Sequence, residues 1–148
     1  MTYRATLAVG LIMAAAAAPA PAEETRQLVK LPEMMQEHML GNMRDHVKAL
    51  NAILEALAAG DADKAAQVAE KRLGMSSLEA HGAAHMAPFM PEGMRAIGTR
   101  MHKTASRFAI VVRNAELARG GEGARQVFGA LKEITDNCVA CHDAYRIR

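Results

Sequence analysis

The residues Cys138-Val139-Ala140-Cys141-His142 form a C-x-x-C-H pattern close to the C-terminus. This pattern is typical of c-type haem attachment. Two thiols can add to the two vinyl groups of a haem, and the histidine that follows can then lie under the iron. On a helix these positions are i, i+3 and i+4, so the two thiols and the imidazole project from one face. The spacing therefore predicts one covalently bound haem c.

Three other kinds of site use similar residues. A thioredoxin-like C-x-x-C pair needs a strand that leads into a helix, whereas this pair comes late in a helical segment. A zinc site would need a fourth ligand besides Cys138, Cys141 and His142, and any of the other five histidines could supply it. A disulfide between the two cysteines would close almost no loop and would stabilise the fold little. The surrounding sequence favours haem over all three.

Residues 1–22 show the order of features found in a secretory signal peptide. Met1–Arg4 form a short positive start, Ala5–Ala18 are almost entirely apolar, and Ala20-Pro21-Ala22 is a small-x-small cleavage pattern. The apolar run is shorter than the roughly 20 residues that span a bilayer, which disfavours the alternative of a hydrophobic anchor. We expect cleavage near Ala22, export to the periplasm, no stable membrane span afterwards, and one domain over residues 23–148. Because c-type haem is attached outside the cytoplasmic membrane of bacteria, export agrees with the cysteine motif.

The composition offers few bulky side chains for a core. The chain has three Phe, two Tyr, no Trp and eleven Met, and its formal net charge is +2. Alanine and methionine must therefore fill most of the core, and a large flat cofactor would add the missing apolar volume. The nearly balanced charge gives no indication of nucleic-acid binding or of a strongly charged partner.

Apolar residues recur at helical spacing in four segments, and no segment alternates as a strand would. The pattern predicts an all-α protein, an antiparallel up-down four-helix bundle with one covalently bound haem. Short links are expected at Gly60-Asp61 and Gly120-Gly121. The first predicted helix covers Pro32–Ala59. The second begins near Ala62, and a further helical piece covers Leu78–Met86. The third covers Pro91–Arg119 and the fourth covers Glu122–Tyr145.

Each predicted helix carries one apolar face. In the first helix this face repeats at alternating spacings of three and four, as in a helix that packs lengthwise on a partner. The residues expected in the core are Leu40, Met43, Val47, Leu50, Leu54 and Leu57 in the first helix, Ala65, Val68, Ala69 and Leu73 in the second, Met94, Ile97, Met101, Phe108, Val111 or Val112 and Ala115 in the third, and Val127, Leu131, Ile134, Cys138, Cys141 and Tyr145 in the fourth.

The chain resembles the class II c-type cytochromes, the family that includes cytochrome c prime. The stretch from Cys138 to Arg146 is similar to the family ending C-x-x-C-H-x-x-[YF]-R, and Leu40–Ile53 is similar to the family's distal helix. The resemblance implies that Cys138 and Cys141 carry the thioethers and that His142 is the proximal iron ligand. It also implies that Arg146 lies near the haem edge or a propionate. The alternative for Arg146 is an exposed cation at a helix end, where the dipole favours it.

The resemblance further implies what lies on the distal side of the iron. A gapless match puts Leu40 over the iron, which would leave a dry pocket open only to small diatomic gases. Met39 and Met43 flank it, and either thioether could instead be the sixth iron ligand. Gln36 comes one turn earlier, where several gas-binding relatives have Arg, and an amide stabilises ligand charge less than a guanidinium does. His46 points away from Leu40 and is expected to be exposed.

A second group of residues has ligands that suit copper. His81 and His85 are spaced i, i+4 on the expected short helical piece, and three methionines, Met86, Met90 and Met94, follow. Imidazole and thioether groups both bind copper. The alternative is a surface histidine pair beside a methionine-lined apolar contact.

These patterns lead to one leading functional hypothesis and two others. The first is a periplasmic monohaem cytochrome that passes single electrons between redox proteins, with no bond-making catalysis by the chain itself. The second is a five-coordinate protein that binds NO or CO beneath Leu40. The third is an exported copper-binding protein that uses the His81 and His85 group. The resemblance also makes a homodimer through the first two helices an open expectation.

Overall fold

The computed structural model describes residues 24–115 and 121–148, and these residues are almost entirely helical. The predicted all-α class is confirmed. The predicted leader, residues 1–22, and the expected end of the third helix at Arg119 lie outside the described residues. The elements are β1 (Gln27–Leu28), α1 (Glu33–Ala58), α2 (Ala62–Arg72), the 3-10 turn η1 (Met75–Ser77), α3 (Ala83–Met86), the 3-10 turn η2 (Ala87–Phe89), α4 (Glu92–Ala115), α5 (Glu122–Ala144) and β2 (Tyr145–Arg146).

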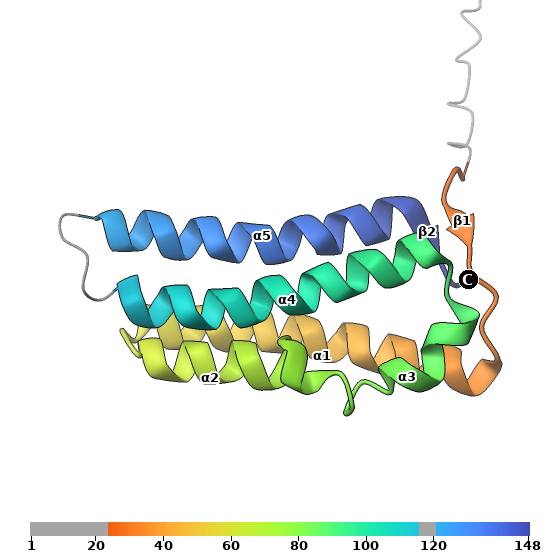
Figure 1. The fold of residues 1–148 in the computed structure, drawn as a ribbon, viewed down its shortest axis with the longest axis horizontal. Coiled ribbons are helices and arrows are strands. Elements are labelled where there is room, and N and C mark those ends of the chain that lie inside the picture. The colour runs from red at the N-terminus through yellow and green to blue at the C-terminus, as the bar shows by residue number, and fades with distance from the viewer. Residues whose placement is uncertain (1–23, 116–120) are drawn as a thin grey trace, which may run out of the picture.

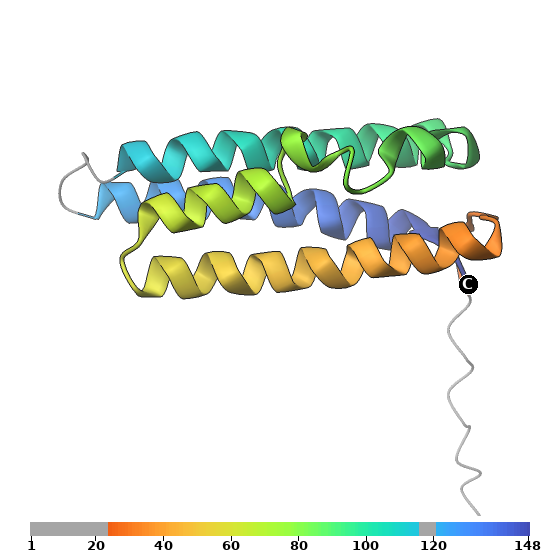
Figure 2. The same ribbon diagram turned by 90° about the horizontal axis from the view of Figure 1, so that it is seen from below.

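The helices α1, α2, α4 and α5 lie along one common long axis, and successive members run in opposite directions (Figures 1 and 2). Helix α4 packs along both α5 and α2, and α2 packs along α1. Within the described residues, the backbones of α1 and α5 approach each other far less than those of the other neighbouring pairs. Three pairs of helices therefore pack closely: α1 with α2, α2 with α4, and α4 with α5. Helices α1 and α5 are spaced more widely.

The helix ends follow from local sequence. The side chain of Asp61 accepts a hydrogen bond from the backbone N–H of Lys64 at 2.8 Å and so caps the start of α2. Gly60 before it has a φ of +74°, a conformation that costs glycine little. The predicted helix over Leu78–Met86 is wrong in its first half, because Gly82 has a φ of +61° and α3 begins only after it.

The main core lies between α1, α2, α4 and α5 and is built largely from alanine. The small side chains of α2 and α4 let the helices approach closely, and Phe108 of α4 fills the space between them with none of its surface exposed. A second, smaller core lies beside Cys141 and Tyr145. Its buried members are Val29, Leu31, Met39, Met86 and Met94.

The face that α1 presents to the core differs from the predicted one. Met39, Ala49, Ile53 and Ala56 are buried, whereas Val47 is 67% exposed and Leu54 is exposed. The helix is turned from the predicted orientation by less than the roughly 100° of one residue, because Leu50 and Leu57 of the predicted face still pack against the main core and Met43 against the smaller one. The sequence permits this turn because apolar residues stand next to each other along α1. Alanine at the contact also lets a neighbouring helix approach more closely than leucine would.

A short pair of strands joins the two ends of the described chain. β1 and β2 are parallel, with Gln27 opposite Tyr145 and Leu28 opposite Arg146. The backbone N–H of Val29 donates to the carbonyl of Arg146 at 2.7 Å. The sequence predicted no strands and extended the last helix to Tyr145, so this pairing is a correction. Among the described residues, no helix combines the length and the apolar character needed to cross a bilayer.

Replacement of Phe108 by Ala should lower the free energy of unfolding by about 3–5 kcal/mol, because the deletion leaves a cavity in the main core. Phe128→Ala is the matched control, since Phe128 on α5 is 62% exposed and its loss should change stability by less than about 0.5 kcal/mol. Urea unfolding followed by circular dichroism measures both. Equal losses in the two variants would contradict the core described above.

Candidate functional site

A cavity of about 570 Å³ opens between α1, the segment around α3, α4 and α5. Its volume lies within the roughly 300–1,000 Å³ of typical cofactor and ligand sites. Six of the eleven methionines line it, which makes the lining both apolar and polarisable. They are Met39, Met43, Met86, Met90, Met94 and Met101.

Helix α5 contributes Cys138, Cys141 and His142 to one wall of this cavity. The three side chains share a wall because they are spaced i, i+3 and i+4 on a regular helix. The two cysteines are half-buried free thiols, and His142 is exposed at the edge of the cavity. Burial raises the pKa of both thiols, so each carries its proton at neutral pH. The Sγ–H of Cys138 donates a hydrogen bond to the carbonyl oxygen of Ile134, with an Sγ–O distance of 3.5 Å.

Two of the four residues predicted on the distal side reach the cavity. Met39 and Met43 of α1 line it, whereas Leu40 and Gln36 do not. Leu40 is partly buried outside the wall, and the side-chain amide of Gln36 donates to the carbonyl of Leu31 at 3.3 Å. The cause is the turn of α1 described above, which brings the methionine side of the helix into the cavity.

Arg146 lies on β2, away from the cavity lining. Its Nε stands 3.9 Å from Oε2 of Glu24, in the segment that leads into β1. The structure therefore places Arg146 partly buried beside the N-terminal strand and just beyond the end of α5, so it is not an exposed cation at the helix end. Its place near the edge of a haem stays a prediction.

Three histidines from different elements come together in the wall formed by α1 and α4. The ring centroids of His46 on α1 and His81 before α3 are 4.8 Å apart, and His102 on α4 lies 5.4 Å from His81 and 6.1 Å from His46. The expectation that His46 is exposed is wrong, because its ring lines the cavity and is mostly buried. His46 follows Met39 by seven residues and Met43 by three, a spacing that could have placed it on the same face.

Hydrogen bonds fix two of these histidines. The Nδ1–H of His102 donates to the carbonyl of Leu73 at 2.7 Å. The backbone carbonyl of His81 accepts from Nδ2 of Asn42 and from Nε2 of His38, both at 2.9 Å. These contacts hold the segment before α3 against α1. The Nε2 atom of His46 is buried and has no hydrogen-bond partner among the described residues.

All three rings are held in the neutral form. Burial, followed by the proximity of His81 and His102, lowers the pKa of His46 to about 4. Burial is also the largest cause that lowers the pKa of His81 and of His102. Neutral imidazole is the form that binds metal ions.

The predicted pairing of His81 with His85 is not formed. Gly82, in its left-handed conformation, separates the two, and only His85 lies on α3. His81 turns into the cavity, whereas His85 is exposed and outside the lining. The partners of His81 are His46 and His102, which come from elements distant in the sequence.

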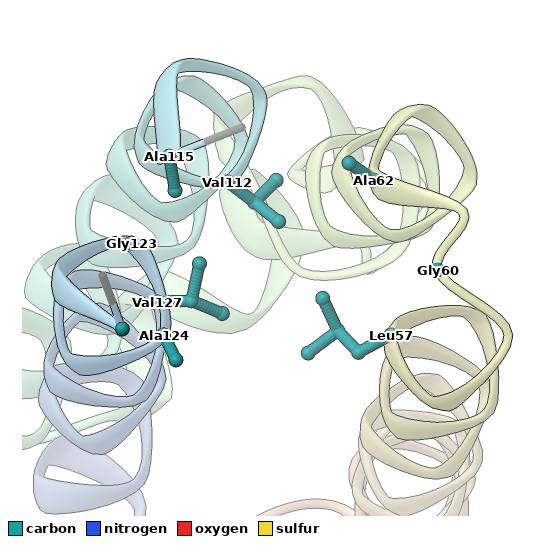
Figure 3. A pocket seen from close by; sticks show the side chains of 9 residues that line it. Leu57, Gly60, Ala62, Val112, Ala115, Gly123, Ala124 and Val127 are labelled. Carbon is teal, nitrogen blue, oxygen red and sulfur yellow. The ribbon is translucent and has the colours of Figure 1, made fainter. Parts of the chain in front are cut away.

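A second hollow of about 350 Å³ lies at the opposite end of the molecule (Figure 3). Leu57 on α1, Val112 on α4 and Val127 on α5 point into it. The described residues that line it are all apolar or glycine, so they offer no group for acid–base or ligand chemistry.

Comparison with known proteins gives no relative: no family model, no curated protein and no solved structure matches this chain. Function is therefore inferred from the residues and from the geometry of the larger cavity.

The lowered pKa of His46 predicts a specific pH dependence of stability. The unfolded ring takes up a proton near pH 6.5 and the folded ring only near pH 4, so stability is complete above pH 6.5 and falls as the pH drops toward 4. Between pH 7 and pH 4, the free energy of unfolding of His46→Gln should fall by about 2 kcal/mol less than that of the wild type. This difference is smaller than the full pKa shift would give, because the ring is partly in contact with solvent. Urea unfolding at pH 7 and pH 4 in metal-free buffer measures the difference. The same pH slope in both proteins would contradict a buried neutral His46.

Proposed function

We propose that the chain is an exported monohaem c-type cytochrome, built as an up-down four-helix bundle, that transfers single electrons between periplasmic redox proteins. One observation carries the proposal. Cys138, Cys141 and His142 share one wall of a cofactor-sized apolar cavity, and Met39 and Met43 line the same cavity from α1. This arrangement supplies the covalent attachment points, an imidazole ligand and a thioether ligand from only two helices.

The residues fit the group chemically. Cys138 and Cys141 are reduced and protonated, which is the state that can add to the vinyl groups to form two thioethers. His142 follows directly and would ligate the iron from the α5 side. The haem, when bound, supplies reversible one-electron chemistry at iron. The chain holds it, sets its ligands and limits its contact with water.

The lining favours electron transfer over gas binding. Leu40, the residue on which the gas-binding hypothesis depends, does not line the cavity, whereas two thioether sulfurs of α1 do. Met39 is nearly fully buried in the smaller core, and Met43 is only partly buried. Met43 is therefore freer to turn, and it would be the thioether that serves as the sixth ligand of a bound haem. Imidazole and thioether together raise the reduction potential.

The remaining wall is mostly apolar. Met86, Met90 and Met94 line the cavity on the side of α3 and the start of α4. Apolar surroundings and limited solvent access also favour the less charged ferrous state, because burial penalises net charge. The predicted signal peptide supports export to an oxidising compartment, where redox proteins are the partners that fit this chemistry.

Covalent attachment is tested by mass. The exported protein should carry the mass of one haem after denaturation, and Cys138→Ser with Cys141→Ser should abolish that gain. Val139→Ala is the control, because Val139 lies between the two cysteines but is 58% exposed, and this variant should keep its haem. A double serine variant that retains haem after denaturation would contradict the proposed linkage.

The sixth ligand is tested by optical spectroscopy with CO. The ferrous wild type should be low-spin and unchanged by CO, whereas Met43→Ala should become high-spin and bind CO, because the thioether is removed. Met34→Ala is the control, since Met34 on α1 is 81% exposed and should leave the spectrum unchanged. If Met39→Ala opens the iron instead, Met39 is the ligand. A wild type that binds CO readily would favour gas binding.

A further inference from the structure

The His46, His81 and His102 group has no role in the proposed electron-transfer site. The three rings come from α1, from the segment before α3 and from α4, and they meet in the cavity wall. Each belongs to a separate element, so their proximity is a product of the tertiary fold.

The ring spacing matches that of a metal ion bound by three imidazoles. A zinc–nitrogen bond of about 2.0 Å puts the metal roughly 3.2 Å from each ring centre, and tetrahedral angles then separate the centres by about 5.2 Å. The observed separations are 4.8, 5.4 and 6.1 Å. The distances therefore allow all three imidazoles to bind one ion after modest rotation.

The nitrogen atoms have suitable roles for such binding. The Nδ1–H of His102 donates to the Leu73 carbonyl, which leaves Nε2 with its lone pair, as in many histidines that bind metals. The Nε2 of His46 is buried and has no hydrogen-bond partner in the part of the chain that the structure describes. In residues 24–115 and 121–148, no three His, Cys, Asp or Glu side chains are placed to hold a metal ion as they stand, so the site requires these rings to rotate. The rings of His46 and His81 border the cavity, which gives them room to rotate.

We propose that His46, His81 and His102 form a binding site for one borderline divalent transition-metal ion, with Zn²⁺ as its tetrahedral representative. Three neutral imidazoles suit zinc and copper and leave a fourth coordination position for water or another ligand. The site uses none of the residues Cys138, Cys141 and His142, although its three rings line the same cavity.

The nearby charges are compatible with a dication. Arg72 is the cation close to His46, and it is already paired with Asp45 through a hydrogen bond from Nε to Oδ2 at 3.2 Å and through a second contact from its terminal nitrogen. The pair is nearly neutral as a whole, and the Asp45 carboxylate, which attracts the protonated forms of His46 and His81, would also attract a bound cation.

Calorimetric titration of the untagged, exported full-length protein with Zn²⁺ tests the site. We expect one ion per chain with a micromolar or lower Kd. Either His46→Gln or His81→Gln should weaken binding at least about 10-fold, because each removes one of three ligands. His85→Gln is the matched control, since His85 is exposed and outside the cavity, and it should leave the Kd unchanged.

Two control measurements distinguish a loss of metal binding from a loss of folding or of haem. Circular dichroism of each variant reports whether the helices still form, and the haem content of each sample is read from its absorbance. Weaker binding in well-folded His46→Gln and His81→Gln supports the site whether or not haem is attached. Absence of stoichiometric binding below about 100 μM in the wild type, or an equal loss in His85→Gln, would overturn the proposal.

Discussion

The packing of α4 against both α2 and α5 is the contact on which the rest of the structure depends. Phe108 and the alanines of the main core lie at the contacts among these three helices. Helix α1 is attached mainly through α2, so its backbone stays apart from that of α5. The cavity lies in the space between them and is lined from both helices.

The smaller core beside the cavity includes residues that follow β1, near the start of the described chain. The parallel pairing of β1 with β2 brings Val29 and Leu31 next to the methionines of the smaller core. This pairing also stops α5 directly after the C-x-x-C-H motif, at Ala144. The motif therefore lies on the last turns of a helix whose earlier turns are fixed in the main core through Ile134 and Val127, and its geometry is inherited from that rigid segment.

The sequence predicted the four long helical segments, most of their ends and the shared face of Cys138, Cys141 and His142, because helical periodicity and capping are local properties. It did not predict which way α1 faces. Met39 and Leu40 are both apolar and adjacent, as are Ile53 and Leu54, so periodicity allows two orientations and only packing chooses between them. The histidine group was missed for a related reason, since His46, His81 and His102 meet only through tertiary contacts, and the one local pairing considered, His81 with His85, is broken by Gly82.

The orientation of α1 links the two proposals. One face of this helix brings Met39, Met43 and His46 into the cavity at spacings of four and three, while Leu40 lies outside the lining. A turn of the helix in the opposite sense would place Leu40 over the cavity and separate His46 from His81 and His102. The packing of α1 on α2 that accompanies this orientation thus decides which thioethers and which imidazole α1 presents to the cavity. The proposed haem ligand Met43 and the proposed metal ligand His46 both depend on this one orientation.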